Sequence, residues 1–147
     1  MKKNIFALST FLLFLSLFYY GCNNDRLLSI SGNVTLDGKP LPEGIIMFLP
    51  SGTEGNSAST TITNGKYSVR VSPGKMVIRI LAERPYTEEE IKKLRANPMY
   101  NNDPMFQPEK MKKQYLPQKY NEKSLLNEEI HGNNKSLNFN LECSEEL

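Results

Sequence analysis

The chain has 147 residues, enough for one ordinary domain, and it contains 18 basic and 16 acidic residues. Lys2 and Lys3 are the charged residues of segment 1–21, so removing that segment would leave 16 residues of each sign. A chain without net charge lacks the broad positive field that attracts nucleic acid. Composition therefore argues against a nucleic-acid partner, and against strong binding to anionic lipid through a basic patch.

Residues 1–21 are predicted to be a secretory signal. Lys2 and Lys3 form its positive start, segment 5–20 is almost continuously apolar or aromatic, and a sharply polar segment follows Cys22. The 16 residues of that apolar segment are fewer than the roughly 20 that a membrane-spanning helix needs. Export is therefore favoured over a membrane helix.

The end of this signal resembles that of bacterial lipoproteins, in which a small residue precedes a cysteine that is lipidated and becomes the new N-terminus. Gly21 and Cys22 fit that pattern, whereas Tyr19 stands where the family usually has leucine. The resemblance implies that acyl chains such as palmitate on Cys22 hold the domain at a bacterial membrane, facing the periplasm or the cell surface. Segment 22–27 is then a short tether, since five extended residues reach at most about 18 Å.

Cys143 leaves two alternatives open. If Cys22 carries lipid, Cys143 is a single thiol near the C-terminus. A Cys22–Cys143 disulfide would instead close the whole domain and would exclude a thioether-linked lipid on Cys22. Neither cysteine has the spacing to another cysteine or histidine that a metal site requires, so we expect no metal and no cofactor.

The first half of the exported chain has the pattern of β-strands. Residues 28–36 alternate apolar and polar side chains, and Gly32 at an inward position indicates a bulge or a close backbone approach. The Asp-Gly pair at 37–38 predicts a tight turn. The proline-containing segment 39–44 predicts a connection, and the apolar run 45–49 predicts a strand buried on both faces.

The Asn-Gly pair at 64–65 is the strongest short-range signal in the chain. Between two strand patterns it predicts a two-residue hairpin, because both positions require a positive φ. The hairpin joins a strand over 58–62 to one over 67–71. The Ser-Pro-Gly sequence at 72–74 predicts another turn, followed by an alternating strand over 76–80.

The segment 84–118 contains five of the nine prolines and interrupts the β pattern. Thr87 and Glu90 form a capping box that predicts one short helix, ended by Asn-Pro at 97–98, and a further helical turn is expected over 108–111. A long insertion in a compact domain is typically functional or disordered. This one concentrates aromatic and methionine side chains, which are enriched at binding surfaces. The candidate partner-binding residues are Tyr86, Tyr100, Phe106 and Tyr115. The alternative is that the insertion folds back over the edge of the domain.

Strand signals return at 126–130, a turn follows at 131–134, and an alternating strand covers 137–141 before the acidic tail 143–147. The total of about seven short strands argues for an all-β sandwich over 28–142. A closed barrel is the structural alternative, and the periodicity excludes a helical fold.

Several of these segments are similar to one family. Segment 32–42 resembles the opening strand and turn of transthyretin-like, carboxypeptidase-regulatory-like domains, and segments 63–67 and 71–75 resemble their T-x-x-G-x-Y hairpin and V-x-P-G-x-Y turn. Segments 116–130 and 134–141 resemble the C-terminal block and closing strand of small planctomycete lipoproteins of this type. The resemblance implies a seven-stranded, prealbumin-like β-sandwich, and it implies no established activity.

The sequence lacks a recognisable catalytic set. His131 is the single histidine and lies in a Gly-Asn turn, whereas the hydroxyisourate hydrolase that resembles this domain in fold needs several histidines. The acids at 88–90 are typical of a helix N-terminus, and Glu128 and Glu129 would point to opposite faces of a strand. We therefore expect that the protein is not an enzyme.

These observations predict a non-catalytic, membrane-tethered envelope lipoprotein. It would act as a binding or structural accessory module that presents segment 84–118, or an exposed strand edge, to a protein partner. The alternative is a small-ligand or glycan-binding sandwich of the cell envelope. That alternative ranks lower because carbohydrate sites favour exposed aromatics and the chain has no tryptophan.

Overall fold

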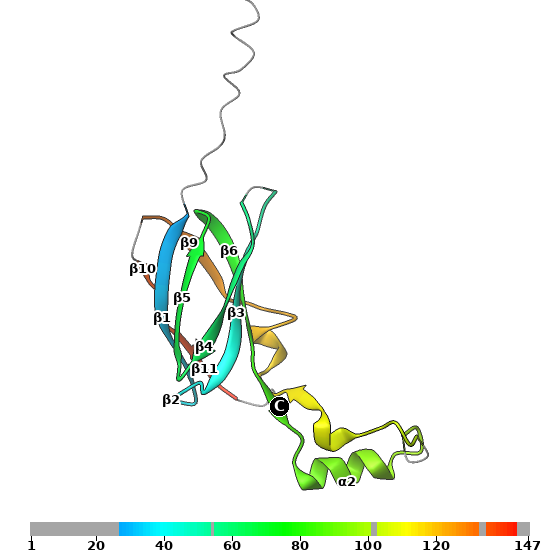
Figure 1. Cartoon of the computed structure of the whole chain (residues 1–147). Helices are drawn as coiled ribbons and strands as arrows, with labels where there is room; N and C mark the ends of the chain where they lie inside the picture. The colour runs from blue at the N-terminus through cyan, green and yellow to red at the C-terminus, as the bar shows by residue number, and fades with distance from the viewer. Residues whose placement is uncertain (1–26, 54, 101–102, 133–134, 144–147) are drawn as a thin grey trace, which may run out of the picture.

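The computed structural model of the chain describes residues 27–53, 55–100, 103–132 and 135–143 (Figure 1). The predicted signal, the lipidation site Cys22, nearly all of the tether and the tail beyond Cys143 lie outside the described residues.

The described chain is mostly β-strand and contains one short α-helix, as the sequence predicts. The strands are β1 (Leu28–Leu36), β2 (Lys39–Pro40), β3 (Glu43–Pro50), β4 (Ala58–Thr63), β5 (Lys66–Val71), β6 (Gly74–Leu81), β7 (Glu83–Pro85), β8 (Lys112–Gln114), β9 (Asn127–Ile130), β10 (Lys135–Ser136) and β11 (Phe139–Leu141). The helical elements are α2 (Glu88–Ala96) and the 3-10 turns η2 (Pro108–Lys110) and η3 (Gln118–Tyr120).

Most of the strands form one curled sheet in the order β10-β1-β5-β4-β3-β6-β9, with β2 and β11 also paired to β1. The long neighbouring strands pair antiparallel, whereas β10 and β11 pair parallel to β1. Strands β4 and β5 pair only beside their hairpin turn, where Thr63 lies opposite Lys66. Beyond that point they diverge, so the half of the sheet with β1 and β5 faces the half with β3 and β6 (Figure 1).

The hydrophobic core lies between these two halves of the sheet. Phe48 on β3 faces Tyr67 on β5 with ring centroids 6.1 Å apart, and Tyr67 lies 6.3 Å from Phe139 on β11. Alternate residues of each strand supply the rest of the core, as the period of two predicts. They include Ile30, Val34, Ile46, Ile62, Val71, Met76, Ile78, Ile80, Ile130 and Leu141.

The prediction that segment 45–49 is buried on both faces was wrong. Ile46 and Phe48 are fully buried, but Ile45 is 46% exposed, and Met47 and Leu49 are only half-buried. The reason is that β3 packs against the other half of the sheet through one face. The α-helix of the described chain lies on a separate extension and does not cover the outer face of β3 (Figure 1).

The predicted turns at 37–38 and 64–65 and the close approach at Gly32 are confirmed. Residues 133–134 of the predicted turn at 131–134 lie outside the described residues. Asn64 and Gly65 have φ values of +50° and +74°, as a two-residue hairpin turn requires. At Gly32, a Cβ atom would lie 1.6 Å from the carbonyl oxygen of Leu137. Glycine is therefore required where the closing segment of the chain crosses β1.

Residues 83–114 leave the sheet as an extension that we call the arm (Figure 1). Strands β7 and β8 pair antiparallel as its two-stranded base, and α2 and η2 lie beyond them. In Figure 1 the arm projects from the end of the sheet opposite to the end where the chain enters β1. Only the residues after the arm return to the core. Leu116 is buried in the core, and Tyr115 packs against the core.

Candidate partner-binding arm

Helix α2 is defined by its ends, because it has no buried residue. The Thr87 hydroxyl accepts a hydrogen bond from the Glu90 N–H at 3.4 Å, and the Glu90 carboxylate accepts one from the Thr87 N–H at 2.9 Å. This is the capping box that the sequence predicts. At the other end, the Asn97 N–H donates to the Leu94 carbonyl oxygen at 3.1 Å. Local capping rather than burial therefore determines where the helix begins and ends.

The Glu90 carboxylate also connects the helix to both strands at the base of the arm. Arg84 on β7 donates two hydrogen bonds to it, at 2.9 and 3.0 Å, and Lys113 on β8 forms a second ion pair. Hydrogen bonds from Arg84 and then Lys113, with the backbone bond from Thr87, hold the pKa of Glu90 far below its usual range. This one side chain therefore fixes the direction in which α2 leaves the β7–β8 ribbon.

A further ion pair joins the last turn of α2 to η2. Arg95, in the last turn of α2, donates to the Glu109 carboxylate in η2, with an Nε–Oε1 distance of 3.1 Å. The hydrogen bond from Arg95 also lowers the pKa of Glu109. Segments 97–100 and 103–106 lie between these two partners in the sequence, and we call them the tip.

The tip exposes large apolar side chains around an aromatic pair. Tyr100 and Phe106 stack with ring centroids 4.6 Å apart and an interplanar angle of 16°. Met99 is 75% exposed and Met105 is 82% exposed. Methionine is usually among the more buried residue types, so two of them exposed on one loop form an unusual surface.

The structure brings together two of the four predicted partner-binding residues. Tyr100 and Phe106 meet at the tip, while Tyr86 lies at the start of the arm, with Lys113 Nζ 5.8 Å from the centre of its ring. Tyr115 lies at the base, where it is half-buried against the core and its backbone N–H donates to the Ala82 carbonyl oxygen. Burial raises the pKa of Tyr115. The four residues therefore do not form one site.

Sequence reasoning missed the role of Glu90 in joining the arm to its base. The local pattern identifies Glu90 as a capping residue, but its pairing with Lys113, 23 positions away, depends on the strand pairing of β7 with β8. The high methionine content of the insertion is the sequence feature that indicates a binding surface there. Exposure of those side chains is visible only in the folded chain.

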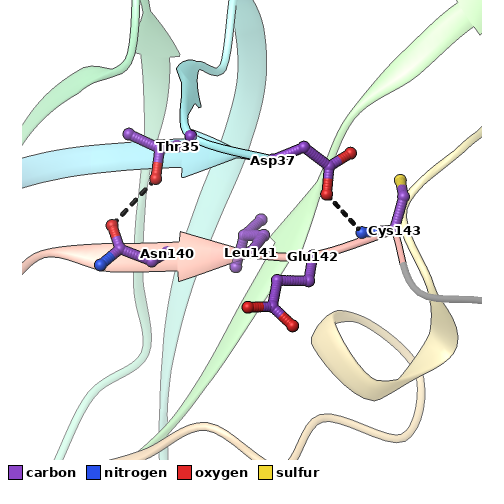
Figure 2. Close-up of a pocket in the computed structure, with 7 residues that line it drawn as sticks. Thr35, Asp37, Asn140, Leu141, Glu142 and Cys143 are labelled. Atoms are coloured by element: carbon purple, nitrogen blue, oxygen red, sulfur yellow. Dashed lines mark hydrogen bonds between the residues drawn. The ribbon is translucent and has the colours of Figure 1, made fainter.

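A shallow pocket of about 790 Å³ lies at the ends of β1 and β11 (Figure 2). Its polar groups connect the last strand to the turn after β1: Thr35 Oγ1 donates to Asn140 Oδ1 at 2.9 Å, and the Cys143 N–H donates to Asp37 Oδ1 at 3.0 Å. Cys143 is exposed within the described residues and its thiol is free there, while burial and then Asp37 raise its pKa.

Within the part of the chain that the structure describes, no helix is long and apolar enough to cross a membrane. In the same residues, no group of three or more histidine, cysteine, aspartate or glutamate side chains is placed to hold a metal ion.

No protein-family model and no curated protein matches this sequence. Among solved structures, the chain is similar to a 9R-lipoxygenase from Cyanothece PCC8801, with 12% sequence identity over 80% of this chain and a TM-score of 0.37. The matched part spans 16% of that lipoxygenase chain. A likeness of this size defines neither a shared fold nor a shared activity.

Proposed function

We propose that this chain is an exported, non-catalytic envelope lipoprotein. In this proposal, lipid on Cys22 tethers a prealbumin-like β-sandwich that presents the arm to a protein partner. The observation behind it is the tip, where Met99 and Met105 are exposed beside the stacked pair of Tyr100 and Phe106. Methionine and aromatic side chains are enriched in the energetically important parts of protein interfaces.

The arrangement of the strands supports the prealbumin-like part of the proposal. Two segments that resemble transthyretin-like domains, 32–42 and 63–67, belong to β1 with its following turn and to the β4–β5 hairpin. That hairpin is where the sheet turns from one layer to the other. The resemblance therefore falls on the parts of the chain that produce a two-layer fold.

The position of the arm supports a partner that lies away from the anchoring membrane. The chain enters β1 at Leu28, and the arm leaves from the other end of the sheet (Figure 1). A tether over 22–27 reaches at most about 18 Å, so a lipid on Cys22 would hold the Leu28 end close to the bilayer. The tip would then point outward, where a second envelope protein can meet it.

The construction of the arm favours binding without large rearrangement. Glu90 holds α2 on the ribbon, Arg95 and Glu109 close the loop, and the aromatic pair is already stacked before any partner arrives. Side chains that are ordered in advance lose less conformational entropy on binding. Exposed methionines, which are flexible and polarisable, adapt to the shape of the partner.

Site-specific crosslinking in intact cells tests the binding proposal. A photoreactive amino acid is placed at Met105 on the tip, and a matched control carries it at Thr61, an exposed position on β4. We expect one reproducible protein adduct from position 105 and none from position 61. Equal adducts from both positions, or no adduct from position 105, would contradict the proposal.

Mass spectrometry of the N-terminal peptide tests the tether independently. We expect an acylated Cys22 at the new N-terminus, and Cys22→Ser should release the protein from the membrane fraction. An unmodified N-terminal peptide would remove the lipoprotein part of the proposal and leave the role of the arm open to the crosslinking result.

Binding of a small ligand or glycan is the second candidate function, and the pocket in Figure 2 is the observation that favours it. Its lining combines the polar side chains of Asp37 and Asn140 with the apolar side chain of Leu141. Titration with envelope sugars should then shift the NMR signals of Asn140 and Glu142. Unchanged signals at saturating sugar would reject this candidate.

A further inference from the structure

The tip contains the same four-residue pattern twice. Segments 97–100 and 103–106 read Asn-Pro-Met-Tyr and Asp-Pro-Met-Phe, so each has Asn or Asp, then proline, methionine and an aromatic residue. The two copies begin six positions apart in the sequence.

Both copies fold into the same turn. Asn97 Oδ1 accepts a hydrogen bond from the Met99 N–H at 3.0 Å, and Asp103 Oδ1 accepts one from the Met105 N–H at 2.8 Å. In each turn the backbone carbonyl of the first residue also accepts from the N–H of the aromatic residue, at 3.0 and 3.1 Å. An Asn or Asp side chain bonded in this way forms an Asx-turn, and the proline that follows has a fixed φ. Each methionine therefore occupies the equivalent place in its own turn.

The two turns lie against each other. Their aromatic residues, Tyr100 and Phe106, are stacked at 4.6 Å, and the Arg95–Glu109 ion pair closes the loop behind them. Neither thioether side chain is buried in the core: Met99 is 75% exposed and Met105 is 82% exposed. Two exposed thioether side chains thus extend from turns whose aromatic residues stack on each other.

Thioethers are soft ligands that select Cu(I) among biological metals, whereas Mg²⁺ and Ca²⁺ require oxygen ligands. Aromatic rings close to the site add attraction for a cation. We propose that Met99 and Met105 form a binding site for a soft monovalent cation, Cu(I), with Ag(I) as its redox-inert substitute. This site requires the two sulfur atoms and not merely an apolar surface, so it does not depend on the proposed protein partner.

Titration of full-length protein with silver nitrate in chloride-free buffer tests the site. The protein carries ¹³C-methyl methionine and the substitutions Cys22→Ser and Cys143→Ser, because free thiols compete for Ag(I). We expect the methyl signals of Met99 and Met105 to shift together and to saturate at one Ag(I) per chain, while those of Met47 and Met76, on β3 and β6, stay unchanged. If neither tip signal shifts, the proposal is wrong.

Leucine variants separate sulfur coordination from apolar contact. Met105→Leu should weaken the Ag(I) response of Met99 by about tenfold or more, since one of two ligands is lost, and Met47→Leu is the matched control. An unchanged response of Met99 in the Met105→Leu variant would overturn the paired site.

Leucine has a similar volume to methionine and is tolerated well, so the double variant Met99→Leu/Met105→Leu keeps the apolar tip. Partner crosslinking from a reactive amino acid at position 106 should survive in it, which distinguishes failure of the metal site from failure of the partner-binding proposal.

Discussion

Gly32 lies directly beneath the carbonyl oxygen of Leu137, so close that a Cβ on Gly32 would be 1.6 Å from that oxygen. The Leu137 N–H in turn donates to the carbonyl oxygen of Ser31 at 2.9 Å. The closing segment of the chain is therefore bonded to β1 at Ser31, next to the one position of the strand where a side chain is absent. This contact joins two parts of the chain that are about a hundred positions apart in the sequence.

Gly32→Ala should be strongly destabilising, because the obstacle to the new methyl group is backbone that cannot rotate away. Overpacking of this kind costs about 1–3 kcal/mol. Urea denaturation would measure the loss. Gly52→Ala is the matched control, since no atom lies within 4 Å of a Cβ at Gly52, and it should leave the free energy of unfolding nearly unchanged. Equal stability of the two variants would contradict the close approach.

Tyr67→Phe should remove about 1 kcal/mol of stability. The buried Tyr67 hydroxyl donates to the same Leu137 carbonyl at 2.9 Å, and the variant loses this hydrogen bond while keeping the ring between Phe48 and Phe139. The slope of the urea transition should not change. A loss of several kcal/mol would mean that the ring packing changes as well.

Alkaline stability should also depend on Tyr67. Burial, followed by the charge of Glu128, raises the pKa of Tyr67 above its usual value. The folded state then releases the phenol proton at a higher pH than the unfolded state, whose tyrosines titrate near pH 10. Stability from this group is therefore complete below about pH 10 and decreases as the pH rises further. Urea midpoints measured from neutral to alkaline pH should fall less steeply in Tyr67→Phe than in the wild type, and Tyr86→Phe on the arm should behave like the wild type.

Glu90→Gln should loosen the arm without weakening the core. The substitution removes the charge that pairs with Arg84 and Lys113, so amide hydrogen exchange in α2 should become faster while exchange in β6 stays unchanged. Glu89→Gln removes the same charge from the same turn of the helix and is the control. Faster exchange in both variants to the same extent would show that the helix dipole, and not the ion pairs, holds α2.

Protonation of the Glu90 carboxylate should loosen the arm in acid. Hydrogen bonds from Arg84 and Lys113 lower the pKa of Glu90 in the folded arm, so the stability it contributes is present above the ordinary glutamate pKa, near 4.3. That stability is lost as the pH falls below this value. NMR signals of α2 should therefore report fraying in acid before the signals of the sheet change. A simultaneous change of both would contradict a separate transition of the arm.

Replacing residues 87–113 with a short glycine-serine turn should leave the sheet folded. The Gln114 side-chain oxygen accepts hydrogen bonds from the N–H groups of Ala82, Tyr115 and Leu116 at 3.0–3.1 Å, and these four residues remain in the variant. Circular dichroism should show a cooperative thermal transition within a few degrees of that of the full chain. Partner crosslinking from the tip would be lost with the tip itself. A variant that does not fold would show that the arm is part of the core.

Much of the architecture follows from short-range patterns in the sequence. The Asn64-Gly65 turn and the Thr87–Glu90 capping box both form as predicted, because their partners lie within three positions along the chain. The alternation of apolar residues identifies the buried face of β6 for the same reason. The sequence indicated the insertion that contains the proposed binding residues. It did not indicate that Tyr100 and Phe106 would contact each other while the other two would lie elsewhere.

The tertiary structure alone decided the features that depend on distant partners. Strands β10 and β11 pair parallel to β1, and Asn138 Oδ1 accepts a hydrogen bond from the Asn33 N–H across 105 positions. The same holds for the partial exposure of the outer face of β3 and for the pairing of Glu90 with Lys113. Local preference sets the backbone angles of a turn or a cap, whereas burial and long-range pairing depend on which segments the folded chain brings together.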